Sequence, residues 1–332
     1  MTTRQRTILI FPGQGSQYVG MGKDLYDQFP LVREIYDAAS QVLGYDMAEL
    51  CFQKHMFGKF MHKADLNKTI YTQPAVLTMS YACYRVLKET CKERGIDLRI
   101  SLLAGHSLGE YTALLVGGAM DFETALSLVN KRAELMTEWG TSYPGAGLMA
   151  VVNKGKQIDN EKICALCKDF GVYITLNNTP SQLVVGGSKR RLGEMGAQLK
   201  KDGILSTMLK VEGPFHTPIM KPAADKFKKH LERCDMDIAS TPILANVSNE
   251  AIVDPIHIRQ ELYHQIFNVV NWRGAIERIL QKPGNLFIEL GPKQVLSNMI
   301  KDTDPSVPRI NMEDTETLEA IITRLSNQIE ED

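Results

Sequence analysis

A short apolar run, a serine between two glycines and a helix-forming run follow one another at residues 100–115. The run ISLLA (100–104) is typical of a strand buried on both faces of a sheet. Gly105 and Gly109 then flank Ser107 in the pattern Gly-x-Ser-x-Gly. A strand that turns sharply into a helix through this pattern places the serine hydroxyl at an exposed corner. The segment therefore predicts an α/β fold with a reactive serine.

Buried strands separated by helices are expected along most of the chain. Apolar runs predict strands at 7–11, 241–247 and 285–290, and helical patterns predict helices at 74–90 and 122–137. Pro74 is expected in the first turn of its helix, where its missing N–H costs nothing, and Asp121 is expected to cap the next one. This alternation predicts an α/β-hydrolase-like domain with a largely parallel sheet.

The middle of the chain follows another order. Strands are expected at 145–152, 172–176, 182–187 and 204–211, with helices at 158–169 and 188–201. The order β-α-β-β-α-β is the ferredoxin-like pattern. We therefore expect residues 140–209 to form an inserted ferredoxin-like subdomain. Residues 1–139 and 210–332 would then form one discontinuous catalytic domain.

Composition excludes some classes of partner. The 332 residues include 38 basic and 39 acidic side chains, so nothing points to nucleic acid or an anionic membrane as the main partner. No apolar stretch approaches the roughly 20 residues of a membrane span. Scattered cysteines predict a cytoplasmic protein with free thiols. Cys164 and Cys167 are expected to be buried structural thiols rather than a metal or redox pair.

A serine hydroxyl needs a base to become a good nucleophile. His216 is the strongest candidate because Pro214 and Pro218 stiffen its loop, which lies where the chain leaves the inserted segment. A cleft between two subdomains is a common place for a site. His106 is adjacent to Ser107 in sequence and is the second candidate, although adjacent side chains at such a corner usually point apart.

Arg132 lies on the apolar face of the helix expected at 122–137. Positions 125, 129 and 136 of the same face are Ala, Val and Met. Arginine is rarely buried without a partner. The guanidinium either binds a carboxylate ligand in a pocket or forms an internal ion pair with an acid of the protein.

A basic run, KRRLGEMGAQLKK, occupies residues 189–201. Such a run is usually the solvated face of a helix. The alternative is a docking patch for an acidic partner, centred on Arg190 and Arg191.

Several motifs together identify a family. They are FPGQGSQYVGMG (11–22), LNKTIYTQPA (66–75), GHSLGEYTAL (105–114), KRAELM (131–136) and PFHTPIMKPAA (214–224), with weaker matches in NVSN (246–249), NVVNW (268–272) and IELGPKQVL (288–296). The chain resembles the malonyl-CoA:acyl carrier protein transacylases of fatty acid synthesis and the trans-acting acyltransferases of polyketide synthases. The matches span about residues 6–300 in family order.

The resemblance implies a dyad of Ser107 and His216 without a third carboxylate. A backbone carbonyl orients the histidine in this family, and NVVNW suggests that Asn271 supplies it. The backbone N–H groups of Gln14 and Leu108 would form the oxyanion hole.

The resemblance also implies a substrate pocket. Gln73 would line it, Arg132 would bind the malonyl carboxylate, and Met136 would form part of the wall. Phe215 before the histidine resembles malonyl-selecting members, since a phenyl ring would crowd an α-methyl group. Gly213-Pro214 departs from the His-Ala of many polyketide versions.

The expected activity is ping-pong malonyl transfer from malonyl-CoA, through a Ser107 ester, to the phosphopantetheine thiol of an acyl carrier protein. No metal or cofactor is needed, and a monomer is expected. The alternative is an acyl hydrolase that clears carrier proteins with the same Ser–His pair. Arg132 distinguishes the two, because a hydrolase of neutral acyl groups has no carboxylate for it.

Overall fold

The structure, a computed structural model, describes residues 5–53 and 65–329. Its larger sheet has six strands in the order β10-β9-β1-β2-β7-β8. Neighbouring strands are parallel except β7 and β8, which are antiparallel. The strands are β1 (Arg6–Phe11), β2 (Ile100–Gly105), β7 (Ile243–Leu244), β8 (Ala251–Ile252), β9 (Asn285–Leu290) and β10 (Arg309–Met312). The predicted α/β architecture is confirmed.

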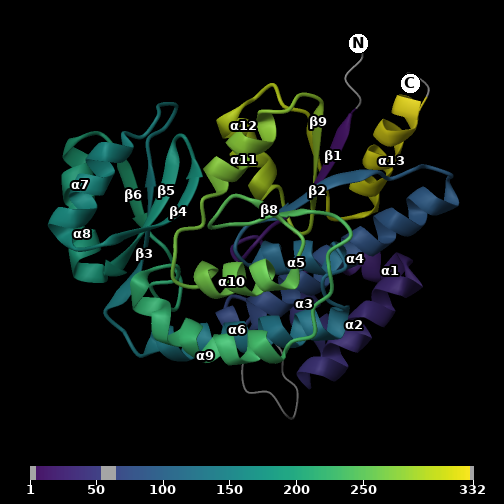
Figure 1. Cartoon of the computed structure of the whole chain (residues 1–332), viewed down its shortest axis with the longest axis horizontal. Helices are drawn as coiled ribbons and strands as arrows, with labels where there is room; N and C mark the ends of the chain where they lie inside the picture. The colour runs from purple at the N-terminus through teal and green to yellow at the C-terminus, as the bar shows by residue number, and fades with distance from the viewer. Residues whose placement is uncertain (1–4, 54–64, 330–332) are drawn as a thin grey trace.

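Helices cover both faces of this sheet (Figure 1). Along β1, Ile8 and Ile10 face one apolar cluster, and Leu9 and Phe11 face the other. The first cluster is completed by α11 (Trp272–Leu280) and α12 (Val295–Thr303). The second is completed by α1 (Lys23–Gln28), α2 (Pro30–Leu43), α3 (Met47–Phe52), α4 (Thr69–Glu93), α5 (Leu108–Val116), α6 (Phe122–Thr141), α9 (Lys221–Arg233), α10 (Pro255–Gln265) and α13 (Thr315–Ile329). Alternating side chains of a strand buried on both faces produce this division.

A second, four-stranded antiparallel sheet stands beside the first, in teal in Figure 1. Its strands β3 (Ala146–Val152), β4 (Tyr173–Thr179), β5 (Gln182–Ser188) and β6 (Leu205–Met208) lie in the order β4-β5-β3-β6. Helices α7 (Asn160–Phe170) and α8 (Lys189–Lys201) pack on it through their own apolar cluster. The element order is the expected β-α-β-β-α-β, while the domain boundaries at 139–140 and 209–210 stay a prediction.

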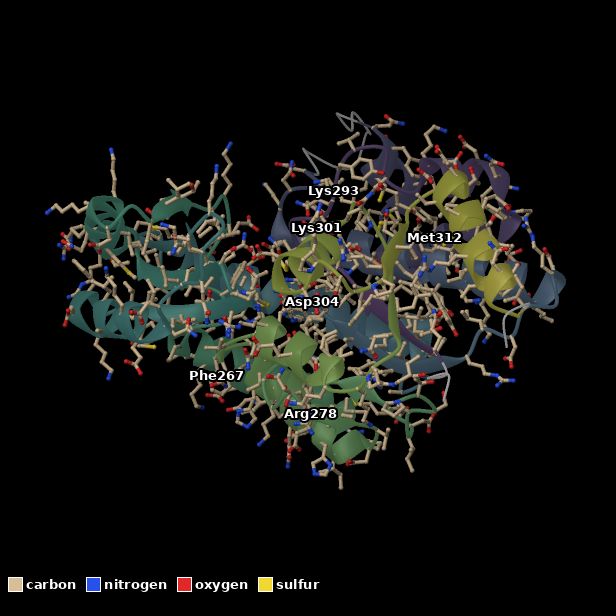
Figure 2. The ribbon with its side chains drawn as sticks, turned by 90° about the horizontal axis from the view of Figure 1, so that it is seen from above. Phe267, Arg278, Lys293, Lys301, Asp304 and Met312 are labelled. Atoms are coloured by element: carbon tan, nitrogen blue, oxygen red, sulfur yellow. The ribbon has the colours of Figure 1, made fainter. Side chains whose placement is uncertain are left out.

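The edge strand β4 is tied to the segment that precedes α11. The backbone N–H of Asn177 donates to Val270 O at 3.0 Å, and the N–H of Val270 donates to Thr175 O at 3.0 Å. Figure 2 shows Phe267, from the same segment, between the teal sheet and the green helices. The two sheets therefore meet along residues 267–271.

Some expected elements differ from those observed. The helix expected at 74–90 begins at Thr69, so Pro74 lies inside it rather than in its first turn. A proline there removes the hydrogen bond that its own N–H would make and crowds a carbonyl of the preceding turn, yet the helix continues through it to Glu93. The strand expected at 241–247 is limited to Ile243–Leu244, because the residues after it turn toward the serine corner. In the described part of the chain no helix is long and apolar enough to cross a membrane.

Candidate active site

The corner between β2 and α5 is a strained backbone turn. Ser107 has φ 50° and ψ −102°, a conformation that side chains rarely adopt. A Cβ on Gly105 would lie 2.0 Å from the carbonyl carbon of Gly109, and a Cβ on Gly109 would lie 1.9 Å from Phe11 O. Both glycines are therefore required by close backbone contact. The predicted strand–serine–helix corner is present.

Asn246, just after β7, holds this corner from the side. Its Oδ1 accepts a hydrogen bond from the Ser107 N–H at 2.7 Å, and its Nδ2 donates to Gly105 O at 2.7 Å. One amide thus satisfies a donor and an acceptor that the sharp turn leaves without backbone partners. These bonds offset part of the strain at Ser107.

His216 lies against the serine hydroxyl. Its Nε2 is 2.8 Å from Ser107 Oγ, and its Nδ1 is 2.6 Å from the backbone oxygen of Gln265. A carbonyl oxygen can only accept, so Nδ1 carries the hydrogen and Nε2 presents its lone pair to the hydroxyl. This is the arrangement that a general base requires.

The expectation that Asn271 orients His216 is wrong, because the carbonyl of Gln265 occupies Nδ1. Asn271 instead accepts from Asn177 Nδ2 at 2.8 Å and donates to Asn249 Oδ1 at 2.6 Å. Its side chain also caps α11. Asn271 therefore fastens β4 to the start of α11.

The imidazole of His216 is held in its neutral form. Burial, together with the nearby positive charge of Arg132, lowers its pKa to about 3, although the bond to Gln265 O acts in the opposite direction. A histidine normally has a pKa of about 6.5. Above pH 5 the lone pair on Nε2 is therefore available to take a proton.

Two backbone donors were expected near the hydroxyl. Leu108 is the first residue of α5, so its N–H belongs to the helix end that has no partner within the helix. Gln14 lies in the loop after β1, which packs directly on the corner: a Cβ on Gly13 would be 2.5 Å from His106 O. The side chain of Gln14 is anchored by a bond to Thr69 Oγ1 at 3.1 Å. Both N–H groups belong to segments packed at the serine.

Arg132 comes from α6 and is only 1% exposed. Its Nη2 is 3.0 Å from Ser107 Oγ and 2.9 Å from Gln265 Oε1, and its Nη1 is 2.7 Å from Gln73 Oε1. Its guanidinium also lies over the ring of Tyr111, 5.2 Å from the centroid. Between Arg132 and the acidic side chains of residues 5–53 and 65–329, the structure shows no ion pair. The internal ion pair considered from the sequence is therefore not formed there.

The remaining expected pocket residues lie around this guanidinium and the histidine. Gln73 is buried, and its Nε2 points to Met136 Sδ at 3.8 Å, which leaves its oxygen for Arg132. Phe215 is 5% exposed and lies against Gly213, directly before the histidine. Arg190 and Arg191 lie on α8, where Arg190 pairs with Glu194.

His106 points away from the hydroxyl. Its Nε2 is 2.9 Å from Asn178 Oδ1 on β4, and its ring packs edge-on against Trp272. Burial lowers its pKa as well. His106 thus connects the serine corner to the second sheet rather than serving the hydroxyl.

A cavity of about 320 Å³ has His216 in its lining, although neither Ser107 nor Arg132 lines it. It runs between α7 and β4 on one side and residues 267–269 on the other, with Lys168 and Phe267 in its lining. A neighbouring cavity of about 440 Å³ shares Cys164 with it. Cys167 is buried as expected, but Cys164 is exposed, so the expectation of two buried thiols is wrong for Cys164.

Three residues of the site were not predicted: Gln265, Asn246 and Glu110. Asn246 begins the quoted NVSN motif, and Glu110 stands in GHSLGEYTAL, so both lay in recognised motifs without a role. Gln265 lies outside every quoted motif. Its contribution to His216 is a backbone oxygen, which no residue type signals.

Comparison with known proteins agrees with this geometry. The model of a family described as "Acyl transferase domain" matches residues 8–326. The malonyl CoA-acyl carrier protein transacylase of Bacillus subtilis (strain 168) is 35% identical over 324 residues, which are 96% of this chain and 97% of that protein.

Two solved structures show the same likeness. An acyl carrier protein S-malonyltransferase from Vibrio cholerae O1 biovar eltor superimposes with a TM-score of 0.84 at 33% identity, covering 95% of this chain and 99% of that one. A malonyl-transacylase solved in complex with its type II polyketide synthase acyl-carrier protein gives 0.86 at 36% identity, covering 97% and 99%. The chain belongs to the malonyl CoA-acyl carrier protein transacylase family of acyl transferase domains.

Proposed function

We propose that this chain transfers a malonyl group from malonyl-CoA to the phosphopantetheine thiol of an acyl carrier protein, in fatty acid or polyketide synthesis. One observation carries the proposal. A buried guanidinium, that of Arg132, lies 3.0 Å from the Ser107 hydroxyl and is bound to amide oxygens rather than to an acid. An acyl group with its own carboxylate would supply the missing negative charge.

In the first half-reaction His216 Nε2 takes the Ser107 proton as Oγ attacks the thioester carbonyl. The carbonyl electrons move onto its oxygen, which the N–H groups of Gln14 and Leu108 would stabilise, at about 3–4 kcal/mol for each donor. The tetrahedral intermediate collapses with cleavage of the C–S bond. His216 then returns its proton to the leaving thiolate, which leaves malonyl-Ser107 and free coenzyme A.

In the second half-reaction the carrier's thiol gives its proton to His216 and attacks the ester carbonyl. Collapse breaks the bond to Ser107 Oγ, which takes the proton back. The cavity that has His216 in its lining is proposed as the path of the pantetheine arm. A single chain supplies every residue of this arrangement. That the protein is a cytoplasmic monomer stays a proposal.

The carrier is proposed to dock beside this cavity. Arg190 and Arg191 lie on α8, which packs against α7, and Lys168 of α7 lines the cavity. An acidic carrier surface would meet these cations as its arm enters. Phe215 beside the histidine is proposed to disfavour an α-methyl group.

Intact-mass measurement tests the proposal. The chain is mixed separately with malonyl-CoA, acetyl-CoA and methylmalonyl-CoA, and then with a phosphopantetheinylated carrier protein. We expect a malonyl adduct on the unmodified chain, none on Ser107→Ala, and its transfer to the carrier. An adduct that persists on Ser107→Ala would place the nucleophile elsewhere. Faster loading of acetyl groups, followed by release as free acid, would favour the acyl hydrolase.

A further inference from the structure

Glu110, in the first turn of α5, is a buried acid that the proposed reaction does not use. It is 1% exposed. One of its oxygens accepts from the Asn246 N–H at 3.2 Å, and the other accepts from Gln265 Nε2 at 2.5 Å. Both oxygens therefore act as acceptors, toward two different segments around the serine corner.

Gln265 transmits this contact to Arg132. Its Nε2 donates both to Glu110 and to the backbone oxygen of Ser107, the latter at 2.8 Å. With both amide hydrogens used on one side, its Oε1 faces the other side, where Arg132 Nη2 donates to it at 2.9 Å. A reversed amide would direct its NH₂ group at the guanidinium and lose all three bonds. The acceptors around Nε2 thus fix which way the amide points.

Burial governs the charge of Glu110. Together with the neighbouring Glu261 it raises the pKa of Glu110 well above its usual range, although the bonds from Gln265 and Asn246 and the charge of Arg132 act in the opposite direction. The carboxyl group lies one amide away from the guanidinium and forms no ion pair with it. The link between Glu110 and Arg132 therefore rests on the hydrogen bonds of this amide rather than on charge.

We propose that Glu110, acting through the side chain of Gln265, is the positioning residue that holds Arg132 ready for acyl groups with a free carboxylate. The inference rests on the proposed malonyl transfer and deepens it. It assigns Gln265 two separate roles: the backbone oxygen orients His216, and the side chain orients Arg132. Selectivity for a charged acyl group then depends on a residue that touches no substrate.

Glu110→Gln tests this with almost no change in shape. An amide has one acceptor, whereas Glu110 accepts from two donors. If the new oxygen keeps Asn246, the new NH₂ group faces Gln265 and turns its amide away from Arg132. Gln265→Met provides a second route, because it removes the side-chain link to Arg132 but keeps the backbone oxygen for His216.

Glu261→Gln is the matched control. Glu261 is another buried acid, on the same helix as Gln265, but it accepts from the backbone N–H groups of Val247 and Ser248 rather than from the amide. Each variant is loaded with malonyl-CoA and with acetyl-CoA, and kcat and KM are measured for both. Thermal melting identifies any variant that fails to fold.

We expect Glu110→Gln and Gln265→Met to lower the malonyl-over-acetyl preference at least tenfold, mainly through a higher KM for malonyl-CoA. Acetyl loading of Ser107 should persist, and Glu261→Gln should keep the original preference. Folded variants with an unchanged preference, or an equal loss for both acyl groups, would overturn the inference. If Glu110→Gln does not fold, the malonyl-over-acetyl preference of Gln265→Met alone decides whether the inference holds. If the unmodified chain does not prefer malonyl-CoA, it is the proposed function that fails.

Discussion

Replacement of Arg132 by alanine removes a cation that contacts the Ser107 hydroxyl. Nη1 and Nη2 are held by Gln73 and Gln265, so the protein itself fixes the position of the guanidinium. A prepositioned arginine loses little conformational entropy when a carboxylate binds it. A malonyl carboxylate should therefore pair with the guanidinium without the entropic cost of ordering this side chain.

Removal of one partner of such a pair costs about 2–5 kcal/mol. At about 1.4 kcal/mol for each factor of ten, kcat/KM for malonyl-CoA should fall about 30-fold or more. Acetyl-CoA has no carboxylate, so its kcat/KM should change by less than about tenfold, from loss of packing alone. The preference for malonyl over acetyl groups should therefore collapse, while Ser107 remains able to form an ester.

Loading rates measured by quenched intact mass, at several concentrations of each thioester, give the two values. Lys131→Ala is the matched control, since Lys131 is the neighbouring cation on α6 but pairs with Glu134 at the surface. Full malonyl preference in Arg132→Ala would refute the reasoning. Arg132 would then be a structural group, and the acyl hydrolase would become the better description.

Three further outcomes are expected. Gly109→Ala should lower the melting temperature and the loading rate together, because its Cβ would lie 1.9 Å from Phe11 O; normal melting and activity would show that the corner can relax. The loading rate should change less than about twofold between pH 7 and pH 5, because the pKa of His216 is lowered to about 3; a steep loss, as from a base of pKa about 6.5, would contradict the buried neutral imidazole. Replacing Arg190 and Arg191 by glutamate should slow transfer to the carrier at low salt but spare loading from malonyl-CoA; unchanged transfer would make this run an ordinary solvated face.

Buried strands were the most predictable part of the fold. The strand at 285–290 was predicted with its observed ends, because a parallel strand covered on both faces is a continuous apolar run. The strand expected at 241–247 is too long, because its apolar run continues past the two residues that form the strand. Ala245 and Asn246 are buried although they lie beyond the observed strand, and an apolar pattern does not distinguish burial from strand pairing.

Within the site, side chains with distinctive chemistry were predictable and their partners were not. Ser107, His216 and Arg132 stand out by residue type and setting, and the structure brings them together. The expectation that Asn271 orients the histidine was wrong. The partner of Nδ1 is a backbone carbonyl oxygen, and every residue near the end of α10 carries one, so residue type gives no clue to which is used. Only the path of the backbone decides which one reaches Nδ1.

That backbone contact has a consequence for genetic variation. The oxygen that orients His216 is present whatever amino acid occupies position 265, so codon changes there leave this half of the site intact. Residues 267–271, which bond to β4, follow α10 directly. An insertion or deletion between α10 and this segment would move the Gln265 oxygen, even with every side chain of the site preserved. Substitutions at position 265 should therefore leave the orientation of His216 intact, even where they weaken the hold on Arg132, whereas insertions a few residues away should disturb that orientation. A homologue with an insertion at this point could lack activity while its motifs remain complete.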